Sequence, residues 1–194
     1  MKSAIHNRPS AILPLAVLLA LLGAPACLVL SVNPLYDAES IGWDPALLGT
    51  WHDADDNSSM QIDRGEWKSY KVRYVHPIEQ GDLTGYLTAI GDDRYLDLMP
   101  ARGEDRGSFV VPVHAVLRVR LDGDQMELIP LSYDWFFDRV SRSSRTTAVA
   151  GLVVALDQKE NALIVSPTAA LRDWVRRQPL TGRMFGASAI FTRK

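Results

Sequence analysis

The sequence contains a single cysteine, Cys27, among its 194 residues. One thiol cannot close an intrachain disulfide, and no second cysteine can join it in a zinc-type site. The three histidines after residue 26, which are His52, His76 and His114, lie at no metal-ligand spacing from one another. The sequence therefore predicts no disulfide framework, no metal site and no cofactor.

An excess of basic charge is also missing. The chain has 21 Lys and Arg residues against 23 Asp and Glu residues, a formal net charge of −2. Binding to nucleic acid requires a concentrated basic surface that neutralises phosphates. We therefore expect no nucleic-acid partner.

Motifs for nucleophilic catalysis are absent from the sequence as well. There is no Gly-x-Ser-x-Gly elbow and no glycine-rich phosphate loop. A hydrolase would need a nucleophile beside a base that an acid orients, with one of the three histidines meeting an acidic partner in a cleft. We predict no catalytic residue, and an enzyme is our third hypothesis.

The one long apolar run lies near the N-terminus. Lys2 and Arg8 precede an apolar stretch over residues 11–23, and Ala24-Pro25-Ala26 stands directly before Cys27. This layout is typical of a bacterial secretory signal. We predict that the protein is exported.

Three interpretations of this segment remain open. Cys27 could become the lipidated first residue of a lipoprotein, the chain could be cleaved after Ala26 and released, or residues 11–32 could remain as a membrane-spanning helix. Each places the domain outside the cytoplasm. We expect a protein anchored in the bacterial cell envelope, on the periplasmic side or at the cell surface, with the membrane as partner through a lipid anchor or N-terminal helix.

The rest of the chain shows no repeat and no sign of a second domain. We therefore divide it into a signal peptide (1–26), a tether (27–45) and one domain (46–194).

From Leu47 onward, apolar residues alternate with polar ones, which is the period of a β-strand. The strands predicted from this pattern are 47–54, 58–63, 69–76, 83–90, 93–99, 112–121, 125–131, 151–156, 161–165 and 186–193. In 93–99 and 112–121 the alternation is typical of a sheet with one face in water, and it places Asp97, His114 and Arg118 opposite the apolar face.

Two short helices are predicted before the last strands. Ser132 can cap the first of them. In the second, Ser166 is the expected N-cap and Pro167 the first helical residue. Consecutive strands with short turns favour a mainly β fold, either an antiparallel up-and-down barrel or a strongly curved sheet.

The head of the first strand reads Gly49-Thr50-Trp51, which resembles the Gly-x-Trp signature of the lipocalin-like (calycin-type) β-barrels. The resemblance implies that Trp51 closes the base of the barrel as a structural plug. It also implies that an arginine of the last strand, here Arg193, stacks over the Trp51 ring.

A second resemblance extends over most of residues 33–194. The segments that show it are Asn33-Pro34-Leu35-Tyr36, Pro45 to Trp51, Leu96-Asp97-Leu98, Pro112-Val113-His114, Arg118-Val119 and Asp134-Trp135. They resemble a group of small exported bacterial proteins, many of which begin with a lipoprotein signal and none of which has an assigned activity. The resemblance implies location and architecture, and it supplies no catalytic residues.

The leading functional hypothesis is a non-enzymatic, envelope-tethered domain that binds a small apolar molecule or a lipid. Tyr70, Val72 and Tyr74 share one strand face and could line a ligand cavity, although an eight-stranded barrel can equally be packed solid. The alternative is an interaction module of the cell envelope with a filled core. It would expose an apolar patch, which we expected around Trp135, Phe136 and Trp174.

Overall fold

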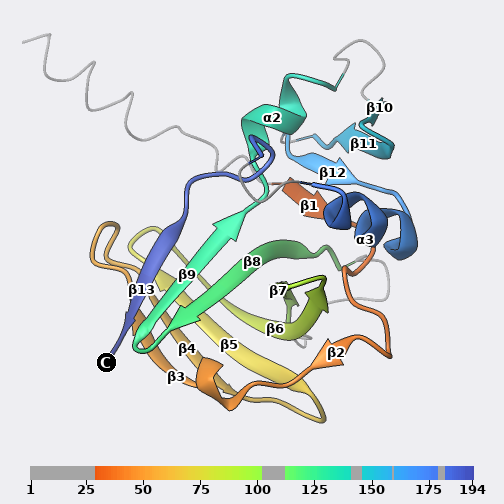
Figure 1. Cartoon of the computed structure of the whole chain (residues 1–194). Helices are drawn as coiled ribbons and strands as arrows, with labels where there is room; N and C mark the ends of the chain where they lie inside the picture. The colour runs from red at the N-terminus through yellow and green to blue at the C-terminus, as the bar shows by residue number, and fades with distance from the viewer. Residues whose placement is uncertain (1–28, 102–111, 141–145, 159, 179–181) are drawn as a thin grey trace, which may run out of the picture.

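A computed structural model describes residues 29–101, 112–140, 146–158, 160–178 and 182–194 (Figure 1). The predicted signal peptide and Cys27 lie outside the described residues. Among the helices within these ranges, none is both long enough and apolar enough to cross a membrane.

Eight antiparallel strands form a closed barrel. Their order around the wall is β6-β5-β4-β3-β13-β9-β8-β7, and pairing between β7 and β6 closes the ring. The mainly β, up-and-down barrel predicted from the alternation is confirmed. The strands are β3 (Gly49–His52), β4 (Ser59–Arg64), β5 (Ser69–His76), β6 (Glu79–Ile90), β7 (Asp93–Pro100), β8 (Ala115–Asp122), β9 (Gln125–Pro130) and β13 (Ala189–Arg193).

Tight hairpins set the order of neighbouring strands. Gly91 and Gly123 begin the two-residue connections from β6 to β7 and from β8 to β9, with φ of +62° and +56°. A positive φ at the first turn position suits glycine, and such turns match the twist of the strands that they join.

A second, four-stranded sheet lies beside the barrel (Figure 1). Three of its strands and the helices α2 and α3 are inserted between β9 and β13, and β1 comes from the start of the described chain. The sheet has the order β1-β12-β11-β10, with β1 parallel to β12. These elements are β1 (Val29–Ser31), β10 (Thr146–Val149), β11 (Leu152–Leu156), β12 (Ala162–Ile164), α2 (Tyr133–Phe137) and α3 (Thr168–Arg176).

Residues 29–45 fold together with the barrel and the small sheet, whereas the sequence predicted a tether over residues 27–45. Besides β1 they form β2 (Ile41–Gly42), which pairs with β6, and the short 3-10 helix η1 (Pro45–Leu47). Leu35 is fully buried, and Arg172 of α3 donates a hydrogen bond to its carbonyl oxygen at 2.9 Å. Isolated apolar residues among polar ones give no periodic signal, so the sequence did not predict that residues 29–45 pack on the rest of the domain.

The molecule has two hydrophobic cores. One fills the barrel around Trp51, Tyr70 and Phe191. The other lies between the outer wall of the barrel and the small sheet with its helices, and it includes Tyr95 and Trp174. The expectation of one face in water is therefore wrong for β7 and for the start of β8, because the N-terminal segment and the inserted segment together cover their outer face.

The helix starts follow local hydrogen bonds. The Ser132 hydroxyl accepts a bond from the Trp135 amide at 3.3 Å, as expected for the cap of α2. The predicted N-cap of α3 is wrong. Pro167 occupies that position, and the Ser166 hydroxyl instead accepts a bond from the amide of Val153 in β11 at 2.7 Å.

We expect the stability of the fold to fall between pH 10 and pH 12. Burial raises the pKa of Tyr36 and of Tyr95 from 10.0 to about 12 in the folded state. Within this window the unfolded chain releases phenolic protons that the folded chain retains, so unfolding becomes more favourable as pH rises. The loss is on the order of 2 kcal/mol for each tyrosine. Urea titrations across this range would measure it, and Tyr95→Phe should flatten the dependence. An unchanged slope in that variant would contradict the assignment.

Candidate functional site

One end of the barrel is closed by Trp51. Its side chain is fully buried, and its indole N–H donates a hydrogen bond to the carbonyl oxygen of Leu47 at 2.9 Å. The Arg193 guanidinium carbon lies 4.1 Å from the centroid of the indole ring, within the range of a cation–π contact. This is the arrangement that the lipocalin resemblance implies.

Further contacts fix Arg193 at this end. It donates hydrogen bonds to the carbonyl oxygens of Leu48 and Ala46, and it forms an ion pair with Asp124 at 3.2 Å. Gly49 has a φ of +132°, and a Cβ atom there would lie 2.7 Å from the Arg193 Nη1 atom. Glycine is therefore required at position 49.

Tyr70, Val72 and Tyr74, which the sequence suggested as cavity lining, lie on the interior strand face. Tyr70 and Val72 are buried within the barrel core, and Tyr74 is half-buried against it. Tyr70 stacks on Trp43 with ring centroids 4.5 Å apart, and its hydroxyl accepts a hydrogen bond from the Asp44 amide at 2.8 Å. Tyr70 is thus held by the chain's own groups.

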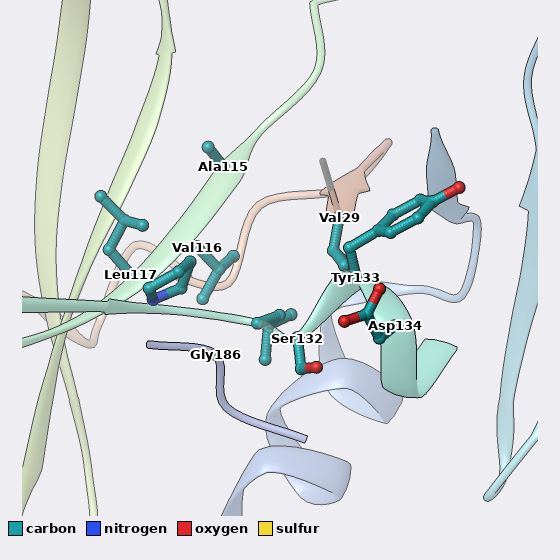
Figure 2. A pocket seen from close by; sticks show the side chains of 10 residues that line it. Val29, Ala115, Val116, Leu117, Ser132, Tyr133, Asp134 and Gly186 are labelled. Carbon is teal, nitrogen blue, oxygen red and sulfur yellow. The ribbon is translucent and has the colours of Figure 1, made fainter. Parts of the chain in front are cut away.

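An open pocket of about 240 Å³ lies at the seam between the barrel and the inserted segment (Figure 2). It adjoins β8, the end of β9, the start of α2 and β1. Figure 2 shows Val29 and Tyr133 on one side and the β8 residues on the other. The lining residues are Val29, Ala115, Val116, Leu117, Pro130, Leu131, Ser132, Tyr133, Asp134 and Gly186.

Polar groups gather at one edge of this seam pocket. Ser132 and Asp134 contribute a hydroxyl and a carboxylate from the first turn of α2. The Tyr133 hydroxyl donates a hydrogen bond to the Glu160 carbonyl oxygen at 2.9 Å, which fixes the ring. A mostly apolar wall with a few convergent polar groups is typical of a small-molecule site.

The seam pocket could not be predicted from the sequence because distant segments build it. The Gly186 amide donates a hydrogen bond to Pro130 O at 2.9 Å, and the Ser132 amide donates one to Met184 O at 2.7 Å. These bonds lay the chain before β13 against the end of β9. The residue pattern of each segment alone does not indicate that the two segments are in contact.

A buried His–Asp hydrogen bond links the N-terminal segment to the outer wall of the barrel. His114 Nδ1 and Asp97 Oδ1 are 2.6 Å apart, and their side chains are 6% and 0% exposed. The second Asp97 oxygen accepts a hydrogen bond from the Leu35 amide at 2.6 Å. The backbones of His114 and Ser31 exchange two hydrogen bonds of 2.8 Å each. Three segments of the second resemblance thus meet here, at Leu35, Asp97 and His114.

The His114–Asp97 pair provides a base and an orienting acid, but its surroundings indicate a structural role. A catalytic histidine needs access to a substrate, whereas these side chains are enclosed between β1, β7 and β8. The other histidines do not add to it: His76 lies 4.0 Å from Asp56 at the barrel surface. Across the described ranges, no three His, Cys, Asp or Glu side chains converge as metal ligands.

The aromatic patch expected around α2 and α3 is absent from this part of the surface. Phe136 and Trp174 are buried, and Trp135 is half-buried with the Arg139 guanidinium 4.2 Å from its ring centroid. Their rings contact one another, with centroids 4.9 to 6.0 Å apart. The aromatic surface that an interaction module would expose is buried here by packing against the small sheet.

Comparison with protein-family models, with curated proteins and with solved structures found no match to this chain.

Proposed function

We propose that this protein is a non-enzymatic binding domain of the bacterial cell envelope, and that the seam pocket takes a small apolar molecule or a segment of a lipid. The lining of that pocket supports the proposal more than any other observation: apolar side chains form its walls and Ser132 and Asp134 its polar edge. Tyr70, Val72 and Tyr74 then belong to the scaffold beneath the site.

The size of the seam pocket limits what can bind. Apolar cavities of about 150 Å³ bind benzene. A pocket of about 240 Å³ suits a molecule somewhat larger than that, or part of an acyl chain. The carboxylate of Asp134 favours a ligand that donates one hydrogen bond.

The tether is the second half of the proposal. Cys27 precedes Val29 by two residues, and two extended residues span at most about 7 Å. A lipid on Cys27 would therefore attach close to the seam pocket, which Val29 helps to line. Mass spectrometry of the protein from its own membrane fraction would detect the acyl chains. An unmodified Cys27 in the membrane-bound protein would contradict lipid anchoring.

Binding is tested with 1-naphthol and naphthalene as probes. We expect chemical-shift changes at Val29, Val116 and Gly186 in NMR spectra of the full chain. We also expect 1-naphthol to bind about fivefold more tightly, because a hydrogen bond contributes about 1 kcal/mol. Asp134→Asn should reduce the preference for 1-naphthol, and Ala115→Leu should weaken both probes by filling the pocket.

Asp138→Asn is the matched control, since Asp138 follows α2 directly and lies outside the pocket. It should bind both probes like the parent chain. Shift changes centred on Tyr70 and Tyr74 would place the ligand inside the barrel instead. The absence of saturable binding by either probe would remove the proposed function.

A further inference from the structure

The small sheet turns one face away from the second core, and aliphatic residues dominate that face. Cross-strand partners place Leu30 beside Leu163, Leu163 beside Ala155, and Val153 beside Ala148. Val165 follows two residues after Leu163 on the same side. We call this set the outer sheet face: Leu30, Ala148, Val153, Ala155, Leu163 and Val165.

The opposite face of the same strands is buried in the second core. Val29, Val154 and Ile164 alternate with the outer residues, and each is at most 8% exposed. The outer face, in contrast, leaves Val153 43% and Val165 37% exposed. An antiparallel sheet with one solvated face normally carries polar residues there. This face has valine, leucine and alanine instead.

No described strand position of the outer sheet face carries a charge, and the polar pair Asp157 and Asn161 lies beyond it, at the hairpin from β11 to β12. The remaining residue of the face in β10 is Thr146, which pairs with Ala155. The free energy of an uncharged aliphatic surface falls when it moves from water into an apolar phase. It has no groups that would select an ionic or nucleic-acid partner.

The position of the apolar N-terminal run indicates what covers this face. Residues 11–23 are apolar, and the apolar character resumes at Leu28-Val29-Leu30, where Leu30 joins the outer sheet face. From Cys27 to Leu30 the chain can span at most about 11 Å. A membrane that holds either Cys27 or the preceding run must therefore lie within reach of β1.

We propose that the outer sheet face docks on the lipid bilayer, with Leu30, Val153 and Val165 in the interfacial region. The proposal rests on the envelope tether proposed above. Tethering and docking together fix one orientation of the domain, whereas a tether alone would let it tumble. Because the face is uncharged, docking should be equally strong on neutral and anionic vesicles and insensitive to salt.

The test places spin labels on Val153→Cys and Val165→Cys in the full chain, reconstituted in vesicles of phosphatidylethanolamine and phosphatidylglycerol. Ile190→Cys and Ile78→Cys are matched controls, because these exposed aliphatic residues lie on the barrel. Oxygen partitions into lipid and a nickel chelate stays in water. We expect the ratio of their collision rates to be several times higher at positions 153 and 165 than at the controls.

Two outcomes would overturn docking. If both collision rates fall at positions 153 and 165, protein covers the face, either a second copy or another part of this chain. If both rates equal those of the controls, the face remains in water.

Lipid anchoring through Cys27 is tested separately, by measuring how much label Cys27 takes up. In the chain without added cysteines, a lipidated Cys27 takes up no label. If label is incorporated, lipid anchoring is wrong. The collision rates at the four labelled positions are then measured again in the Cys27→Ser variant with vesicles added. That second reading decides docking by the same collision rates.

Discussion

Asp97→Ala should lower the free energy of unfolding by about 3–5 kcal/mol, because two buried hydrogen-bonding groups lose their acceptor and each such loss costs about 1–3 kcal/mol. Asp97 is fully buried and satisfies both His114 and the Leu35 amide. The alanine variant leaves both groups without an acceptor away from water. Urea denaturation would measure the loss, and hydrogen exchange should show faster exchange at Leu35.

Asp82→Ala is the control for this prediction. Asp82 is 71% exposed and lies 4.0 Å from Arg73, so its removal should change stability by at most about 0.5 kcal/mol. The double variant Asp97→Ala/His114→Ala should lose less than the sum of the single variants, because neither side chain of the pair is then left buried without its partner. A loss below about 1 kcal/mol in Asp97→Ala would show that the pair is not what holds the N-terminal segment.

Trp51→Ala should also cost about 3–5 kcal/mol, the range for truncating a buried aromatic side chain. The substitution opens a cavity at the barrel base, breaks the hydrogen bond to Leu47 and removes the ring beneath Arg193. Trp51→Phe keeps most of the volume and loses the hydrogen bond, so it should cost about 1–2 kcal/mol. Thermal and urea unfolding of the three proteins would give these differences.

Trp67→Ala provides the matched control, since Trp67 is 65% exposed in the turn between β4 and β5. We expect a change within about 0.5 kcal/mol. A double-mutant cycle of Trp51→Ala with Arg193→Ala should reveal a coupling of about 0.5–2 kcal/mol from the cation–π contact. If Trp51→Ala were as mild as Trp67→Ala, the base of the barrel would not depend on the indole.

The barrel could be predicted from the sequence because its signals are local. Alternation over β4 to β9 gives the strand period, and Gly91 and Gly123 mark the hairpins. Gly49-Thr50-Trp51 indicates which end is plugged. Each of these signals lies within a few neighbouring residues, where sequence patterns are informative.

The second core and the seam pocket depend on contacts between distant segments. Asp97 and His114 resemble surface residues in their alternation, yet the N-terminal segment covers them through Leu35 and Ser31. Only three residues form β1, and its partner β12 comes late in the chain. Polar residues that pair under an added layer give the same alternation as residues in water, so periodicity alone could not separate the two cases.

The parallel pairing of β1 with β12 has a mechanical consequence. Tension applied through the residues before Val29 pulls β1 along its own axis, so that its bonds to β12 are loaded in shear and must yield together. The two backbone hydrogen bonds between Ser31 and His114 carry part of the same load to the barrel wall, directly before β8. An anchored chain end would therefore pull on β12 and on the chain before β8 at once, so that the force would be divided between the small sheet and the barrel.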